Sequence, residues 1–126
     1  MLSLLLDEHL SPEIALAARR LSRGMRIVSI HVWLGGHFVG VSDAELLQEA
    51  VRKKYTLVTF DLRTIPLLLR SWADEGVDHG GVVFVDEKTF AQNNLGGIAR
   101  ALVELWELQG RLDWTNRAFF LQSPRA

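Results

Sequence analysis

The sequence predicts an α/β fold: a three-layer α/β/α sandwich around a mainly parallel sheet of four to five strands. Short apolar runs without polar alternation recur along the chain, as in strands that are buried on both faces of a parallel sheet. Helix-start signals followed by apolar residues at helical spacing separate these runs. No linker-like or low-complexity stretch divides the chain, so residues 1–126 are expected to form a single domain.

The first helix is predicted between two strands. Residues 2–6 (LSLLL) form the first apolar run. Ser11 is a good N-cap and Pro12 suits the first helical position, so a helix is expected to begin there. Gly24 is expected to end this helix, because glycine readily adopts the left-handed conformation that often follows a helix. Residues 25–32 (MRIVSIHV) then form the second predicted strand.

The middle of the chain repeats the pattern after a Gly-rich loop at residues 33–41. Ser42 is expected to begin the next helix, because Glu45 stands three residues later and completes a capping box. Residues 56–60 (TLVTF) form the third predicted strand. A helix over about residues 64–73 follows, with a proline that its first turn tolerates.

The last third of the chain supplies the remaining elements. Residues 82–86 (VVFVD) form the fourth predicted strand. Asn93 or Asn94 is expected to cap a long final helix that Gly110 ends. Residues 117–121 (RAFFL) form a short edge strand.

Composition excludes several function classes. The chain has no cysteine, which rules out disulfides, thiolate zinc sites and a cysteine nucleophile. Its net charge of −1 gives no overall attraction to nucleic acid, although a local basic patch would suffice. We find no signal peptide and no apolar segment long enough to span a bilayer. We therefore expect a cytoplasmic protein that does not act in the membrane.

Aspartates follow three of the predicted strands. Asp7 ends the first apolar run, Asp61 follows the third, and Asp86 closes the fourth. Because parallel strands all point the same way, their carboxyl ends share one edge of the sheet, and ligands bind at that edge in open α/β folds. The three side chains are therefore expected at one edge. For Asp86 a simple turn role is the stronger interpretation.

A fourth aspartate reaches the same region from a helix. Asp43 lies on one helical face with Leu46, Leu47 and Ala50, the predicted core stripe. It should therefore point toward the core at the start of its helix. Local roles would explain these residues as well, because Asp61 can cap the helix that follows it and Asp43 can stabilise a helix N-terminus through the dipole.

Clustered carboxylates favour a metal site. They repel one another, and each has a raised pKa unless a cation compensates. A hard divalent cation such as Mg²⁺ or Mn²⁺ takes carboxylate oxygens and keeps several waters. Such an ion can hold a phosphodiester and activate a water for in-line attack.

Three segments resemble a known family in their order and spacing: LLLDEHLSP, SDAELLQEA and TLVTFD. Together they resemble the short bacterial PIN-like proteins of the PIN-domain superfamily, which are similar to the toxin components of toxin–antitoxin pairs. The resemblance implies an acidic pocket that binds Mg²⁺ or Mn²⁺, cleavage of single-stranded RNA in active members, and an antitoxin partner. Asp7, Asp43 and Asp61 match the acidic motif positions, and Glu8 matches a frequent acidic neighbour.

The third motif departs from the family pattern. In this family the third motif often reads Thr-x-Asp-x-Asp, whereas in this chain Arg63 stands at the position of the second aspartate. Two interpretations follow: Arg63 binds a phosphate of the substrate, or it pairs with Asp61 and replaces the metal.

Three functions are therefore open. The first is a metal-dependent endoribonuclease of the PIN-like toxin type, with Asp7, Asp43 and Asp61 as metal ligands. The second is a PIN-like binding protein without catalysis, which Arg63 favours. The third is a receiver-like signalling domain phosphorylated on Asp61. The last predicted strand argues against this function, because it lacks the required lysine.

The apolar segment at residues 65–72 (IPLLLRSW) predicts either core packing or an interface for an antitoxin or a homodimer.

Overall fold

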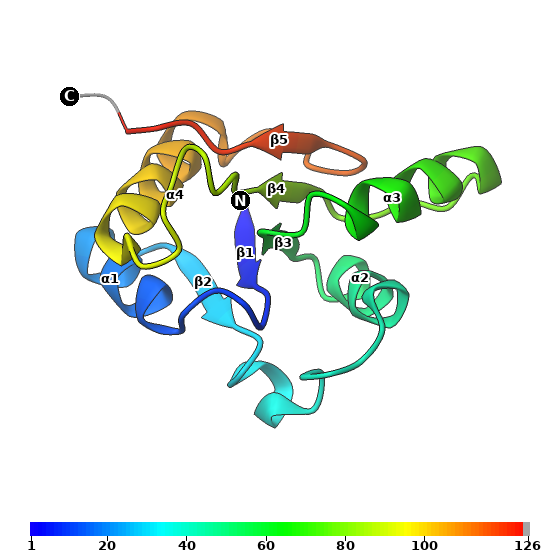
Figure 1. The fold of residues 1–126 in the computed structure, drawn as a ribbon, viewed down its shortest axis with the longest axis horizontal. Coiled ribbons are helices and arrows are strands. Elements are labelled where there is room, and N and C mark those ends of the chain that lie inside the picture. The colour runs from blue at the N-terminus through cyan, green and yellow to red at the C-terminus, as the bar shows by residue number, and fades with distance from the viewer. Residues whose placement is uncertain (125–126) are drawn as a thin grey trace.

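The computed structural model describes residues 1–124 and confirms the predicted fold class. Five parallel strands form one sheet in the order β2-β1-β3-β4-β5, and helices cover both of its faces (Figure 1). The strands are β1 (Ser3–Leu6), β2 (Arg26–Ser29), β3 (Thr56–Thr59), β4 (Val82–Phe84) and β5 (Ala118–Phe120).

Four α-helices form the two outer layers. They are α1 (Glu13–Leu21), α2 (Asp43–Arg52), α3 (Thr64–Glu75) and α4 (Leu95–Gln109). Helices α1 and α4 pack together on one face of the sheet, whereas α2 and α3 contribute to a separate core on the other face (Figure 1). None of the described helices is long and apolar enough to cross a bilayer.

Strand β1 shows why the apolar runs lack polar alternation. Leu4 and Leu6 belong to the core on the α1–α4 face, and Leu5 belongs to the core on the α2–α3 face. All three side chains are fully buried. Successive residues of a strand point to opposite faces, so a central strand covered on both sides needs an apolar residue at every position.

The strand order places a topological switch point between β1 and β3. The chain builds β2 on one side of β1 and then crosses to build β3 on its other side. In doubly wound sheets of this order, ligands bind outside the carboxyl ends of the two strands at that point. Asp7 lies there, because its backbone N–H donates to Val58 O (3.0 Å) and so extends the pairing one residue past Leu6.

Two predicted helix caps are confirmed. The Ser42 hydroxyl accepts a hydrogen bond from Glu45 N (3.2 Å) at the start of α2. The Asn94 carboxamide accepts from Gly97 N (3.0 Å) at the start of α4, and Gly110 is the C-cap of that helix.

The predicted end of the first helix is wrong. Helix α1 ends at Leu21, and Ser22 is its C-cap, with its N–H bonded to Ala18 O (2.9 Å). Ser22 has an extended backbone, so the chain leaves the helix before it reaches Gly24. The second strand is also shorter than predicted, since the Ser29 hydroxyl accepts from His31 N (3.1 Å) in a turn that follows the strand.

The apolar segment of helix α3 was predicted either to pack in the core or to form an interface, and only one side of the helix packs in the core. Ile65 and Trp72 are buried in the core, but Leu67 is 65% exposed. The helix projects well beyond the sheet (Figure 1). The helix is therefore anchored in the core by one side, and an interface on its outer side stays a prediction.

Candidate functional site

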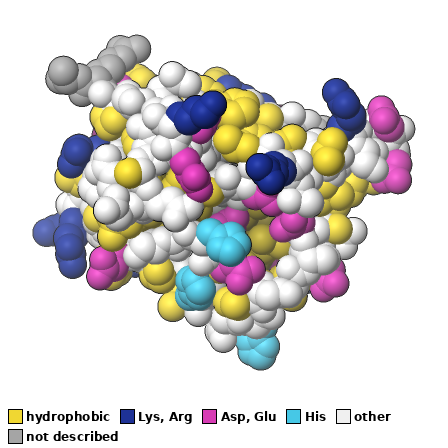
Figure 2. Space-filling view, viewed as in Figure 1, with side chains coloured by type: hydrophobic (Ala, Val, Ile, Leu, Met, Phe, Trp, Pro, Cys, Tyr) yellow, Lys and Arg dark blue, Asp and Glu magenta, His cyan; other side chains and the backbone are white. Residues whose placement is uncertain are grey.

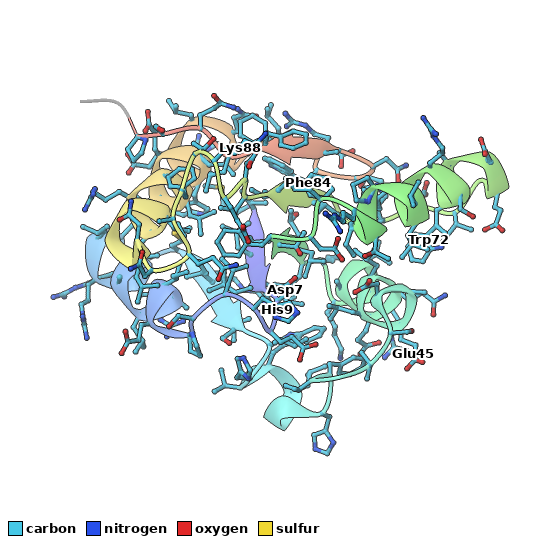
Figure 3. All side chains as sticks on the ribbon, in the orientation of Figure 1. Asp7, His9, Glu45, Trp72, Phe84 and Lys88 are labelled. Atoms are coloured by element: carbon cyan, nitrogen blue, oxygen red, sulfur yellow. The ribbon has the colours of Figure 1, made fainter. Side chains whose placement is uncertain are left out.

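A small enclosed pocket of about 50 Å³ lies at the carboxyl ends of β1 and β3. A pocket of this size has room for an ion and a few waters. Acidic and histidine side chains gather on this part of the surface (Figure 2), and Asp7 and His9 lie at the end of β1 (Figure 3). The lining residues are Asp7, Glu8, His9, Ile30, Phe38, Val41, Asp43, Leu46 and Asp61.

Asp7 is the most buried carboxylate of the pocket, with 9% of its surface exposed. Its Oδ1 accepts a hydrogen bond from His9 N (3.0 Å), and its Oδ2 accepts one from the Thr59 hydroxyl. Burial raises the pKa of Asp7, and the negative charge of Asp43 adds to that rise, while the two hydrogen bonds and the His9 ring oppose it. The structure thus holds a carboxylate where its charge is costly.

Thr59 connects the two strand ends that carry the acidic residues. Its side chain is fully buried, and its hydroxyl donates to Asp7 and accepts from Asp61 N (3.0 Å). The sequence places this hydroxyl near the presumed pocket, but a strand role alone would also explain it. The signal for this role is a threonine at the carboxyl end of an apolar strand, because a buried hydroxyl needs a hydrogen-bond partner.

Asp43 enters the pocket from the first turn of α2. The helical spacing predicted this placement: Leu46 and Leu47 on the same face are buried, and Asp43 is half-buried beside Asp7. Burial raises the pKa of Asp43, and the charges of Asp61 and Glu8 raise it further, while the His9 ring lowers it. Its carboxylate accepts no hydrogen bond from residues 1–124, so its lone pairs are free, unlike those of Asp7 and Asp61.

Asp61 has a local structural role. Its Oδ1 accepts hydrogen bonds from Arg63 N (2.9 Å) and Thr64 N (2.8 Å), and its Oδ2 accepts from the Thr64 hydroxyl (2.7 Å). Burial acts to raise the pKa of Asp61, but these hydrogen bonds outweigh it and hold that pKa below its ordinary value. Asp61 therefore stays ionised. The N-cap residue of α3 is Arg63 rather than Asp61, but Asp61 binds the first N–H of the helix, and it lines the same pocket as Asp43.

The guanidinium of Arg63 does not replace a metal by pairing with Asp61. Arg63 is exposed and binds Asp61 only through its backbone N–H. Within the described part of the chain, the only ion pair joins Arg52 and Glu49 (3.0 Å). The acidic pocket therefore has no arginine or lysine to neutralise it.

Of the two further acidic residues predicted for the site, one lines the pocket and the other does not. Glu8 is exposed and lines the pocket, and its backbone carbonyl hydrogen-bonds His31 Nε2 (3.1 Å). Asp86 is not among the lining residues, and its Oδ1 accepts from Lys88 N (2.9 Å) in the turn after β4. Asp86 therefore has the turn role that was predicted as its stronger interpretation.

The donor set suits a hydrated ion held by few protein ligands. Across residues 1–124, no group of three or more Asp, Glu or His side chains is arranged to hold a metal ion directly. Magnesium, however, is usually bound through one or two carboxylates and keeps several waters. Asp7 and Asp43 could supply those carboxylates, because both have a raised pKa that a cation would relieve.

The loop beside the pocket is anchored in the core by one aromatic residue. Trp33 is buried, and its ring contacts those of Phe38 (centroids 5.3 Å apart) and Tyr55 (5.6 Å). Phe38 is half-buried and lines the pocket. Trp33 therefore anchors the loop and offers no free face to a ligand, and Phe38 forms part of the pocket wall.

Comparison with known proteins finds no match: no protein-family model, no curated protein and no solved structure matches the chain. The likeness to PIN-like proteins therefore rests on the three sequence segments quoted above.

We expect Asp43→Asn to stabilise the protein increasingly as the pH rises above about 4, the ordinary pKa of aspartate. The folded-state pKa of Asp43 is raised, so the folded protein is favoured while this carboxyl is protonated. This contribution to the free energy of unfolding is complete below the unfolded-state pKa and is lost as the pH rises through the folded-state pKa. Because water screens this half-buried group, the gain at pH 7 should be roughly 0.5 kcal/mol. Urea unfolding of both proteins at pH 4 and pH 7, in EDTA, measures it.

The control for this measurement is Asp74→Asn, which removes an exposed carboxylate from α3, outside the pocket. Equal stability differences at both pH values for Asp43→Asn would contradict a repulsive carboxylate cluster.

We expect Thr59→Val to destabilise the protein by about 1–3 kcal/mol, because it leaves Asp7 Oδ2 and Asp61 N without their buried partner. Thr59→Ser keeps the hydroxyl and should retain most of the stability. Urea unfolding of the three proteins checks this, and hydrogen exchange at the Asp61 amide should accelerate in the valine variant alone. A valine variant as stable as the wild type would show that the hydroxyl does not hold the two segments.

Proposed function

We propose that this protein is a metal-dependent endoribonuclease of the PIN-like type that cleaves single-stranded RNA as the toxin component of a toxin–antitoxin pair. The observation that carries the proposal is the pocket at the β1–β3 switch point. There Asp7 and Asp43 share a small space with Asp61 and Glu8, and both have raised pKa values with no lysine or arginine to compensate. Retaining such a cluster is costly for folding, and binding a cation is the simplest use for it.

Asp7 and Asp43 would be the main ligands of Mg²⁺ or Mn²⁺. Hydrogen bonds fix both oxygens of Asp7, and each oxygen keeps lone-pair capacity for a cation. Asp43 has both oxygens free of hydrogen bonds within residues 1–124. Asp61 stays ionised and would act through water, because three hydrogen bonds at the start of α3 already occupy its carboxylate, two of them on Oδ1.

A bound divalent cation would supply a polarised phosphate and a water of lowered pKa. The protein's own contribution is to place negative groups around one small space and to keep their geometry fixed. Thr59 and the backbone N–H of His9 orient Asp7, and Phe38 and Val41 of the loop line the pocket with apolar surface. Glu8 adds charge at the open side of the pocket.

The proposal includes partners and a location. The substrate would be single-stranded RNA in the cytoplasm, and an antitoxin would block the activity. The exposed side of α3, with Leu67 at its surface, is a candidate surface for the antitoxin or for a homodimer.

A second candidate function is a PIN-like binding protein without catalysis. It is favoured by the engagement of both Asp61 oxygens in the α3 start and by the lack, among residues 1–124, of a directly arranged group of three metal ligands. Arg63 at the usual second-aspartate position points the same way. Metal binding separates this candidate from the ribonuclease.

A receiver-like domain is disfavoured. Strand order does not decide the matter, since some receiver proteins share the order observed here. The last strand, β5, lacks the lysine that senses the phosphoryl group in receiver domains. The receiver reading would also leave Asp43 without a role.

We expect wild-type protein to bind Mn²⁺ in a calorimetric titration and Asp7→Asn to lose that binding. Asp86→Asn is the matched control, because it removes an aspartate that follows a strand but does not line the pocket. Cleavage of a labelled single-stranded RNA should require Mn²⁺ or Mg²⁺ and should fall by at least a hundredfold in Asp7→Asn, since several kcal/mol of transition-state stabilisation depend on the ion.

Two results would count against the ribonuclease. The absence of Mn²⁺ binding at millimolar concentration would support the binding-protein candidate. Mn²⁺ binding that Asp7→Asn retains would place the metal outside this pocket.

A further inference from the structure

A row of side chains leads from the acidic pocket across the sheet to an exposed aromatic ring. Thr59 pairs in register with Phe84, and Phe84 pairs with Phe120. Asp7 comes next to Thr59 at the other end, through the hydroxyl bond. Neighbouring strands are about 4.8 Å apart, so three spacings put Phe120 about 14 Å from Asp7 along the carboxyl edge of the sheet.

The Phe120 ring has one free side. It stacks on Phe84, with ring centroids 5.3 Å apart and planes inclined by 30°. Phe84 is buried (2% exposed), whereas Phe120, on the edge strand β5, is 52% exposed. One ring therefore fixes the other from beneath and leaves an aromatic surface open to a ligand.

Two exposed cations lie on the connections that follow the neighbouring strands β3 and β4. Arg63 belongs to the segment that joins β3 to α3, next to Leu62, which packs against the core that contains Phe84. Lys88 follows β4, in the turn that Asp86 closes (Figure 3). Neither side chain takes part in an ion pair within residues 1–124, so both are available to an anion.

We infer that Phe120, Lys88 and Arg63 form a binding subsite for single-stranded RNA that extends the acidic pocket along the carboxyl edge of the sheet. A base stacks on the free face of Phe120, and the two cations bind phosphates between that base and the pocket. This inference rests on the proposed ribonuclease function, and it names the residues that hold the substrate. Stacking on an aromatic ring beside cations is how single strands are bound without base pairing.

The arrangement favours a single strand over a protein partner. A single strand needs a stacking ring and cations together. Phe120 supplies the ring, and the exposed Arg63 and Lys88 supply the cations. Glu87, next to Lys88, is bonded to Gln92 Nε2 (2.6 Å). The acidic pocket repels the phosphates of an approaching RNA. Arg63 and Lys88 would offset this repulsion and hold the RNA backbone near the pocket.

The test is RNA binding measured by fluorescence anisotropy with a labelled octauridylate in EDTA, where no metal-dependent cleavage takes place. We expect Phe120→Leu to weaken binding about tenfold, since it removes the aromatic face and keeps the apolar volume. Lys88→Gln should lower the slope of log K against log salt by about 0.7, the value for one lost phosphate contact. Leu108→Ala and Lys53→Gln, exposed residues outside the proposed subsite, should leave both quantities unchanged.

The outcomes separate the subsite from the proposed function. Wild-type binding that Phe120→Leu does not weaken overturns the subsite, even if the protein cleaves RNA. A wild-type protein that fails to bind the octauridylate at about 50 mM salt also overturns it. A Phe120→Leu variant that binds RNA normally but loses self-association in sedimentation would assign the ring to a protein interface instead. Loss of binding in Phe120→Leu, together with no metal-dependent cleavage by the wild type, supports the subsite and rejects the ribonuclease.

Discussion

The parallel alignment of β1 and β3 brings Asp7 and Asp61 to one edge of the sheet, and the buried hydroxyl of Thr59 joins them there. The hydroxyl donates to the Asp7 carboxylate and accepts from the Asp61 backbone, so one side chain fixes the ends of two strands. Asp43 then reaches the same space from α2, because its helical face is the one that packs on the sheet. The acidic pocket is thus a consequence of how the core is built.

The pocket makes its charges costly, and the rest of the fold tolerates that cost. Burial and mutual repulsion raise the pKa of Asp7 and Asp43, whereas hydrogen bonds from the start of α3 keep that of Asp61 low. Environments that push neighbouring carboxylates apart in pKa are common at functional sites. Because neither Arg63 nor a lysine forms an ion pair with these groups within residues 1–124, an external cation remains the simplest compensation.

Much of the fold could be predicted because its signals are local. The caps at Ser42 and Asn94 act over three residues, and the apolar runs reflect burial on both faces, so the sequence alone indicates them. The direction of Asp43 followed from the spacing of Leu46 and Leu47. The end of α1 did not follow, because Ser22 leaves the helix before Gly24 is reached. The role of Thr59 depends on its partner 52 residues away in sequence, which only the register of β1 and β3 supplies.

The central claim is that the carboxylates of Asp7 and Asp43 hold a divalent cation. The most direct measurement is the anomalous difference map of a crystal soaked in Mn²⁺. We predict one strong peak in the pocket within direct coordination distance of both carboxylates, with waters completing the shell. A pocket without a peak, or a peak bound only by residues elsewhere on the surface, would contradict the claim and leave the acidic cluster as a feature of the fold alone.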